Sequence, residues 1–233
     1  MAGTLYVIGT PIGNLGDITL RALEILEKIE VLVCEDSRVA SRLVHAYIDK
    51  GLLHNSPRYL AYNEFNEARM APEVVRLVAE GTLVGLASDA GMPAISDPGY
   101  RAIRGCLDAG LPVTVIPGVT AMTTALPWSG LGGEVFTYLG FLPKTSGKAH
   151  KMLEASSEML EKLGTGRVVL YVSPHRLLKD LKMIHEVMGN VRIVVCRELT
   201  KMHEERVEGT VEELLNHFTI KPIKGEIVLV LSK

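Results

Sequence analysis

The most informative stretch of the chain is Leu86-Ala-Ser-Asp-Ala-Gly-Met-Pro-Ala-Ile-Ser-Asp-Pro-Gly99. Here an apolar strand leads into a loop of small residues and then into the start of a helix. The strand, residues 83–87, is apolar without alternation, which is typical of a parallel sheet covered on both faces. The loop offers the Asp89 carboxylate among residues too small to shield the main chain. Since α/β proteins bind ligands where strands end, this stretch predicts an α/β fold and a ligand-binding loop.

Two further strands lead into loops of the same kind. Residues 113–116 precede Pro117-Gly-Val-Thr-Ala-Met-Thr-Thr124, and residues 5–8 precede Gly9-Thr-Pro-Ile-Gly-Asn-Leu-Gly-Asp17. Any one such loop is equally explained by glycines and prolines that a turn requires. Together, three of them favour a binding site for a small ligand.

The glycines of the first loop exclude two classes of nucleotide-binding protein. Their spacing is neither G-x-G-x-x-G nor G-x-x-x-x-G-K-[ST], and no lysine stands where a P-loop needs one to hold phosphate. We therefore exclude a Rossmann dehydrogenase and a P-loop kinase or NTPase.

The order of the predicted elements indicates two α/β domains. Strands and helices alternate over residues 1–117, whereas several late strands follow one another with fewer crossover helices, as in a mixed sheet. With 233 residues and 47% hydrophobic composition, the chain can fill two cores. We predict an N-terminal α/β domain over 1–117, a C-terminal α/β domain with a mixed sheet over 118–233, and an active-site cleft between them.

Hydrophobic periodicity places the individual elements. The first helix is predicted with Leu20, Leu23, Leu26 and Ile29 facing inward. A helix with Leu177, Leu181, Ile184 and Met188 on one face is predicted later, and Thr210 with Glu213 predicts a capping box for the last helix. Strands are predicted at residues 5–8, 31–34, 58–61, 83–87, 113–116, 135–139, 168–172, 192–196, 205–208 and 226–231.

The charge balance argues against a general polyanion binder. Lysine and arginine number 25 against 27 aspartate and glutamate, which gives a formal net charge of -2. Any contact with RNA must therefore be local. The candidate basic clusters are Lys144 with Lys148, His150 and Lys151; His175 with Arg176 and Lys179; and Lys221 with Lys224, each of which could equally be a solvated surface.

Cysteine usage and hydropathy indicate the compartment. The cysteines, Cys34, Cys106 and Cys196, are far apart, so we expect reduced structural thiols and no metal site. No apolar run approaches the length of a membrane span, and the N-terminus lacks a signal-peptide pattern. We expect a cytoplasmic protein without a membrane partner.

Short words of sequence across nearly the whole chain carry a resemblance to a known family. They are Thr10-Pro-Ile-Gly-Asn-Leu15, Asp17-Ile-Thr19, Arg21-Ala-Leu23, Glu35-Asp-Ser-Arg38, Ser88-Asp-Ala-Gly91, Asp97-Pro-Gly99, Pro117-Gly118, Gly140-Phe-Leu-Pro143, His175-Arg-Leu-Leu178, Arg197-Glu-Leu-Thr-Lys201 and Lys224-Gly-Glu226. In this order they resemble the tetrapyrrole methylase superfamily, and most closely its ribosomal branch. The resemblance implies S-adenosylmethionine as cofactor, a homodimer, and methylation of a cytidine ribose 2'-hydroxyl in the decoding region of 16S ribosomal RNA within the 30S subunit.

The same resemblance implies cofactor contacts at the ends of strands. Most of them would act through main-chain groups and shape, with Asp89 facing a ribose or an amino group; apolar members could equally be core residues. The implied contacts are Ile12, Ala87, Ser88, Asp89, Met92, Thr120, Ala121, Val172 and Leu199.

A ribose hydroxyl is a poor nucleophile unless its proton is accepted or its developing charge is stabilised, so polar residues of the matching words are the acceptor-side candidates. We expect catalytic roles for Asn14, Glu198 and Lys201. Each candidate could equally be a member of a structural ion pair. The expected substrate-binding residues are Glu35, Asp36, Arg38, His175, Arg176 and Arg197.

The chain departs from the ribosomal pattern at a few places. Val172 stands where an acidic residue is common, and Ser37 and Met92 stand where threonine is usual. The chain also stops after the 226–231 strand, where many ribosomal members continue, so we expect RNA contacts made there to be missing. Two alternatives therefore stay open, a methyltransferase acting on a tetrapyrrole precursor and a non-catalytic cofactor-binding regulator.

Overall fold

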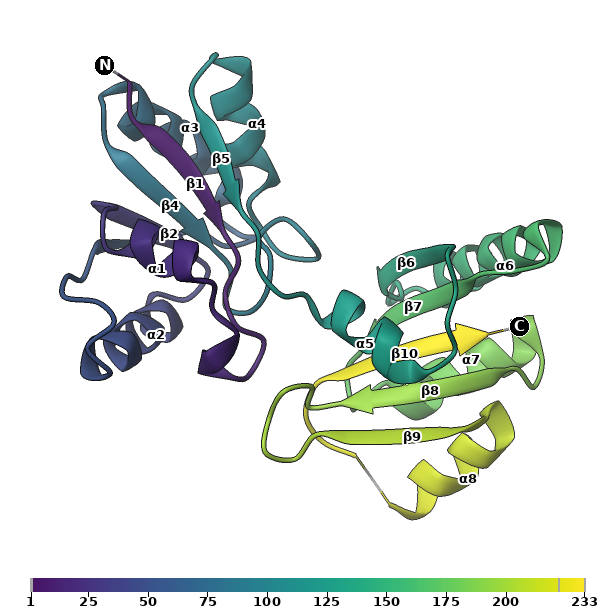
Figure 1. Ribbon diagram of the computed structural model, residues 1–233. Coiled ribbons are helices and arrows are strands. Elements are labelled where there is room, and N and C mark those ends of the chain that lie inside the picture. The colour runs from purple at the N-terminus through teal and green to yellow at the C-terminus, as the bar shows by residue number, and fades with distance from the viewer. Residues whose placement is uncertain (1, 222, 233) are drawn as a thin grey trace. The chain divides into compact units, whose positions relative to one another are not determined.

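The computed structural model describes residues 2–221 and 223–232, and the chain divides into two compact units between Thr120 and Ala121. The sequence predicts the boundary slightly earlier, between residues 117 and 118. Each unit contains one five-stranded sheet with helices packed against it. Figure 1 labels these elements.

The sheet of the first unit is entirely parallel, as its unbroken apolar strands predict. Its order is β3-β2-β4-β1-β5. Because all strands point the same way, the loops that follow them emerge at one edge, which we call the carboxyl edge. The strands are β1 (Thr4–Ile8), β2 (Val31–Cys34), β3 (Arg58–Ala61), β4 (Leu83–Ala87) and β5 (Val113–Ile116).

Helices cover both faces of this sheet because successive strand residues point to opposite sides. Leu32 packs with α1 (Leu20–Leu26) and α2 (Ser37–Asp49), whereas its neighbour Val33 packs with α3 (Glu67–Ala79) and α4 (Tyr100–Asp108). A short 3-10 helix, Leu15–Asp17, precedes α1. The two apolar layers explain why the strands read as continuous hydrophobic runs.

One predicted core position of the first helix is wrong. Leu20 is 80% exposed, because it is the first helical residue after the Thr19 cap, whose side chain accepts a hydrogen bond from the Ala22 amide at 3.1 Å. Leu23 and Leu26 are buried as predicted, and so is Ile29, although it lies beyond the end of the helix.

Strands β1 and β4 lie side by side although the chain leaves them in opposite directions. From β1 the chain passes to β2, on the far side of β4, and from β4 it passes to β5, on the far side of β1. Their following loops therefore meet above the shared carboxyl edge, where α/β sheets bind ligands.

The second unit contains a mixed sheet, as predicted, in the order β6-β7-β10-β8-β9. Strands β6 and β7 are parallel, and β10 is antiparallel to both β7 and β8. Strand β8 also pairs antiparallel with β9. The elements are α5 (Ala121–Ser129), β6 (Phe136–Phe141), α6 (Ser146–Leu163), β7 (Arg167–Val172), α7 (Leu177–Met188), β8 (Arg192–Arg197), β9 (Glu205–Thr210), α8 (Val211–Ile220) and β10 (Ile227–Ser232).

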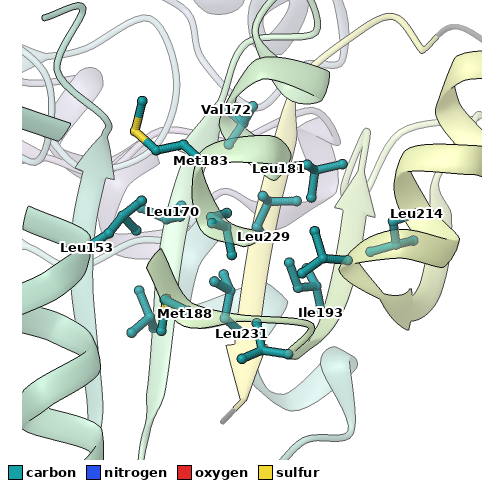
Figure 2. Packing of buried hydrophobic residues seen from close by; sticks show 14 of the residues in the cluster. Leu153, Leu170, Val172, Leu181, Met183, Met188, Ile193, Leu214, Leu229 and Leu231 are labelled. Carbon is teal, nitrogen blue, oxygen red and sulfur yellow. The ribbon is translucent and has the colours of Figure 1, made fainter. Parts of the chain in front are cut away.

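Helices α6, α7 and α8 share one face of this sheet and bury a single apolar cluster (Figure 2). Leu181 and Met188 of α7 pack there with Leu229 of β10, which confirms the predicted inward face of α7. The capping box of α8 is also confirmed, since the Thr210 hydroxyl accepts from the Glu213 amide and the Glu213 carboxylate accepts from the Thr210 amide.

All the cysteines are buried and unpaired, and burial raises the pKa of the Cys34 thiol to about 12. They are structural thiols, as predicted. In the described part of the chain, none of the helices combines the length and apolar character needed to cross a bilayer.

Candidate active site

Three loops of the first unit meet where Gly9 and Gly118 lie backbone against backbone. A β-carbon on Gly9 would be 2.6 Å from the Gly118 Cα and 2.6 Å from the Met92 sulfur, and one on Gly118 would be 2.8 Å from the Gly9 Cα. Only glycine permits this approach. The loops after β1, β4 and β5 therefore form one layer above the carboxyl edge, as the three sequence openings predict.

A two-way backbone bridge fastens the first loop to the second. The Thr10 amide donates to the Gly91 carbonyl at 2.9 Å, and the Gly91 amide donates back at 3.1 Å. The Thr10 hydroxyl, on a residue only 2% exposed, donates to the Ser88 carbonyl at 3.3 Å. Thr10 was not among the predicted site residues, although it begins the first matching word, because a buried threonine has no sequence signature of its own.

Carboxylates line the same edge. The Asp89 carboxylate accepts a hydrogen bond from the Asp36 amide at 3.1 Å, which joins the loops after β4 and β2. Burial, more than the nearby Asp36 charge, raises the pKa of Asp89. Burial also raises the pKa of Asp97 to about 6, although a hydrogen bond with Ser88 opposes the shift, and it raises the pKa of Glu35, with the charges of Asp97 and Asp89 adding to the effect.

Raised carboxylate pKa values mean that the fold, chiefly by burying these groups, disfavours their charged forms. A positively charged ligand bound beside them favours the charged forms. The S-adenosylmethionine implied by the resemblance has a sulfonium and an ammonium group, so the acceptor oxygens of Asp89 and its neighbours suit it. The side chains beside Asp89 are small, so an adenosine or a methionine moiety can approach this loop, although the Ser88 carbonyl and both main-chain groups of Gly91 already bond to Thr10. The residues present therefore fit this cofactor.

The structure brings the predicted residues of the first unit to this edge, with different degrees of access. Ser88 and Thr120 are buried, and a β-carbon on Gly91 would touch the Ile12 side chain at 3.5 Å, which places Ile12 beside the Thr10 bridge. The Ala87 side chain packs into the core with α1 and α2, so only its main chain remains for a ligand. Met92 lies against Gly9.

Acceptor-side candidates of the first unit are held by local hydrogen bonds. The Asn14 side-chain oxygen accepts from the Gly16 amide at 2.9 Å, which caps the 3-10 helix and turns the rest of this exposed amide outward. Arg38 is paired with Asp36 at 2.6 Å, yet its side chain is 85% exposed. Both residues are available to a substrate.

In the second unit, Glu198, Lys201 and Glu226 form one cluster that joins two of the matching words. The Lys201 ammonium lies 2.9 Å from Glu198 Oε1 and 3.0 Å from Glu226 Oε2, and the Glu226 amide donates to Glu198 Oε1 at 2.9 Å. Burial alone would lower the pKa of Lys201, but its carboxylate partners raise it. Burial alone would raise the pKa of Glu198, but Lys201 and the Glu226 amide lower it. Both groups are therefore charged at neutral pH.

The loop that carries this cluster is strained. Glu198 and Thr200 have φ values of 50° and 66°, which side chains with a β-carbon rarely adopt. The Thr200 amide donates to the Glu204 carboxylate at 2.7 Å, while the buried Thr200 hydroxyl has no hydrogen-bond partner. Strain of this kind concentrates at functional sites.

Arg197 stabilises the same loop through hydrogen bonds. Its guanidinium donates to the Glu205 carboxylate at 2.8 Å and to the main-chain oxygens of His203 and Lys224 at 3.1 and 3.2 Å. These contacts are internal, so the structure favours a bracing role for Arg197 over direct binding of a substrate.

Arg176 is held in the same way. Its guanidinium donates to the Leu142 and Pro143 carbonyls at 2.7 and 3.3 Å and pairs at 2.9 Å with Asp180, which is 2% exposed. It thus ties the Gly140-Phe-Leu-Pro143 word to α7. The sequence predicts that Arg176 binds the substrate, but its guanidinium already makes hydrogen bonds within the protein. The neighbouring His175 is exposed.

The remaining candidates of the second unit do not all present side chains to a ligand. The Val172 side chain belongs to the apolar cluster shown in Figure 2, and Leu199 is buried. Ala121 is the first residue of α5. Among the residues that the structure describes, no group of three histidine, cysteine or acidic side chains is arranged to hold a metal.

Comparisons with known proteins agree with the fold. The model of the tetrapyrrole (corrin/porphyrin) methylases matches residues 4–215. The chain is 40% identical over 230 residues to the ribosomal RNA small subunit methyltransferase I of Thermotoga maritima, covering 99% of this chain and 98% of that protein. It is 41% identical to the protein of the same name from a Hydrogenobaculum species, covering 98% and 95%.

The fold is also that of solved structures with little sequence similarity. Uroporphyrin-III C-methyl transferase from Thermus thermophilus, complexed with S-adenyl homocysteine, superposes with a TM-score of 0.67 at 19% identity, covering 98% of this chain and 97% of that one.

Proposed function

This chain belongs to the family of tetrapyrrole (corrin/porphyrin) methylases, and we propose that its substrate is the RNA of the small ribosomal subunit. The enzyme is a methyltransferase that uses S-adenosylmethionine. Its acceptor is the 2'-hydroxyl of a cytidine in the decoding region of 16S ribosomal RNA.

The proposal draws its main support from the Glu198–Lys201–Glu226 cluster. The cluster is built from the Arg197-Glu-Leu-Thr-Lys201 and Lys224-Gly-Glu226 words. The first of these, together with Gly9-Thr-Pro-Ile-Gly-Asn14, resembles the ribosomal branch rather than the tetrapyrrole branch. The Thermotoga and Hydrogenobaculum relatives, which match along nearly their whole length, bear the name of a small-subunit RNA methyltransferase. The hydrogen bonds among Glu198, Lys201 and Glu226 join two of the matching words, which supports the proposal.

When bound, the cofactor supplies a methyl group already activated on sulfur. The chain then has to align the acceptor oxygen, exclude water and stabilise the charge that develops as the hydroxyl loses its proton. Asp89 and the loop around it hold the cofactor. We assign to Lys201, which stays protonated, the stabilisation of the charge on the acceptor oxygen, and Glu198 positions Lys201. As the oxygen–methyl bond forms and the sulfur–methyl bond breaks, the hydroxyl proton leaves to bulk solvent.

Asn14 and Arg38 lie at the carboxyl edge of the first unit, where they donate hydrogen bonds to oxygen atoms of the RNA. Glu35 and Asp36 shape the acceptor side of the same edge, and His175 is an exposed contact on the second unit. A formal net charge of -2 cannot hold RNA by general counterion release. The enzyme therefore prefers the shaped, assembled 30S particle over naked RNA.

A homodimer in the cytoplasm is part of the same proposal. The exposed edge strand β5, whose Val115 is exposed, leaves apolar surface for a second subunit. Light scattering at micromolar concentration should give twice the 25.4 kDa mass of one chain; a monomer mass would contradict the dimer.

The test is transfer of tritiated methyl groups from S-adenosylmethionine to 30S subunits isolated from cells lacking the modification, beside naked 16S RNA and a tetrapyrrole precursor. We expect incorporation into the 30S particle in preference to naked RNA. Incorporation into the tetrapyrrole alone would replace this function with the small-molecule alternative. Saturable binding of S-adenosylhomocysteine without transfer to any acceptor would favour a regulator.

A further inference from the structure

Phe65 is an aromatic side chain with no role in the fold. It is 90% exposed and lies between β3 and α3, in a loop at the carboxyl edge of the first unit. The Tyr62 amide at the start of this loop donates to the Cys34 carbonyl at 2.8 Å, so the loop continues the pairing of β3 with β2. Phe65 therefore belongs to the same edge as Glu35 and Asp36.

Two asparagines fix the loop that presents Phe65. The Asn63 side-chain oxygen accepts from the Phe65 amide at 3.1 Å and from the Asn66 amide at 3.2 Å. In return, the Asn66 side-chain oxygen accepts from the Asn63 amide at 2.8 Å, and the Asn66 amide group donates to the Ala61 carbonyl at 3.1 Å. A loop held by reciprocal hydrogen bonds presents its aromatic ring at little further entropic cost.

The surroundings of Phe65 determine what the ring can bind. The neighbouring Glu64 lies close enough to Glu35 for its charge to contribute, after burial and the charges of Asp97 and Asp89, to raising the pKa of Glu35. An acidic neighbourhood repels phosphate groups, whereas it tolerates the face of a base and accepts hydrogen bonds from exocyclic amines. In the sequence Phe65 lies between the polar residues Glu64 and Asn66, and not within an apolar run.

We propose that Phe65 is a stacking platform for a nucleobase of the RNA substrate. Stacking on an exposed aromatic ring is a general way to hold a single-stranded base, and it does not require a basic surface. This mode of binding suits an enzyme with a net charge of -2. The inference rests on the proposed function, because it names a contact with the same RNA.

The test compares Phe65→Ala, Phe65→Leu and Phe65→Trp with Leu107→Ala, a control that truncates an exposed apolar residue of α4 near the opposite edge of the same sheet. Dissociation constants for 30S subunits are measured by sedimentation, with methyl-transfer kinetics and S-adenosylhomocysteine calorimetry on each variant. We expect Phe65→Ala and Phe65→Leu to weaken 30S binding and raise KM by roughly 5- to 100-fold, with kcat and cofactor affinity nearly unchanged. Phe65→Trp and Leu107→Ala should behave like the unchanged protein.

The outcomes separate this inference from the proposed function. If the unchanged protein does not bind or methylate 30S subunits, the proposed function fails. If it does and Phe65→Ala matches it, the stacking platform is wrong. If Phe65→Leu binds 30S subunits as tightly as the unchanged protein, the contact needs only an apolar side chain, and the stacking proposal is wrong. A Phe65→Ala protein that becomes monomeric in light scattering would assign the ring to a second copy of the chain instead.

Discussion

Gly225 lies so close to Glu198 that a β-carbon on Gly225 would come within 2.5 Å of the Glu198 Oε1 atom. The same oxygen accepts hydrogen bonds from Lys201 and from the Glu226 amide. Gly225 also has a φ of +94°, which favours glycine. One residue without a side chain thus allows the carboxylate to hold Lys201 in place.

Replacing Gly225 with alanine should therefore damage both folding and activity. Strain at the positive φ and the contact with Glu198 should lower the free energy of unfolding by about 2–4 kcal/mol. Methyl transfer should fall at least tenfold, because Lys201 loses its fixed position. Gly164→Ala is the matched control, since Gly164 also has a positive φ of 61° but open space around its β-carbon. Gly164→Ala should lower the free energy of unfolding, measured in urea, by about 1–2 kcal/mol and leave methyl transfer unchanged.

Arg176→Ala should destabilise the second unit. It leaves the Asp180 carboxyl buried without its cation, which costs about 3–5 kcal/mol in comparable buried pairs, and it removes the hydrogen bonds to the Leu142 and Pro143 carbonyls. Urea unfolding monitored by circular dichroism measures the loss.

Adding Asp180→Asn to the Arg176→Ala protein should restore part of that stability, because a neutral amide is cheaper to bury than an unpaired carboxylate. If Arg176→Ala instead unfolds like the unchanged protein and only weakens 30S binding, Arg176 is an RNA contact after all.

Asp97 contributes stability to the first unit in acid that it does not contribute at neutral pH. Burial raises its pKa from 3.8 to about 6, so its protonated form is the one that the fold prefers. The stabilisation is fully present below pH 3.8 and is lost as the pH rises through about 6. Asp97→Asn, which imitates the protonated side chain, should remove this pH dependence.

At pH 7.5 we expect Asp97→Asn to unfold at a higher free energy than the unchanged protein. The pKa shift corresponds to about 3 kcal/mol, and solvent screening of this partly buried group reduces it to about 1–2 kcal/mol. Urea titrations at pH 7.5 and 4.5 should show the gap closing in acid. A gap of the same size at both values would show that Asp97 does not titrate as described.

Lys201→Ala should reduce methyl transfer by about 10- to 100-fold while S-adenosylhomocysteine affinity stays within about twofold. Because its carboxylate partners raise the pKa of Lys201, the ammonium remains charged, and transfer should not decline between pH 7 and 9 through its loss of a proton. Tritium incorporation over this range, beside calorimetry, checks both statements. Parallel losses of binding and transfer would instead place Lys201 at the cofactor.

The sequence predicts the sheet of the first unit closely because its inner strands are mainly apolar runs and turn residues separate its strands from its helices. The ranges 31–34, 58–61, 83–87 and 113–116 match the observed strands. Helix ends are less predictable. Leu20 fits the apolar period of α1, yet it is exposed because the Thr19 cap makes it the first residue of the helix.

The site is predictable only in part, since a motif shows which residues recur together and not what each one touches. Asp89 is a candidate because of its loop, and Lys201 because of its word, and the structure shows the hydrogen bonds that hold both side chains. Arg176 illustrates the limit, because nothing in the sequence tells that its donors are taken by carbonyls more than thirty positions away. Phe65 gives no signal in the sequence either, since its exposure depends on how Asn63 and Asn66 fold the loop.

Nucleoside mass spectrometry of 16S RNA, after reaction of the enzyme with 30S subunits that lack the modification, tests the central claim most directly. The account predicts one new methyl group, on the ribose 2'-oxygen of a cytidine in the decoding region. It also predicts that Lys201→Ala forms this product about 10- to 100-fold more slowly, whereas Gly164→Ala forms it at the rate of the unchanged protein. A methyl group on a base nitrogen or carbon, or no methyl group on the RNA while a tetrapyrrole precursor is methylated, would contradict it.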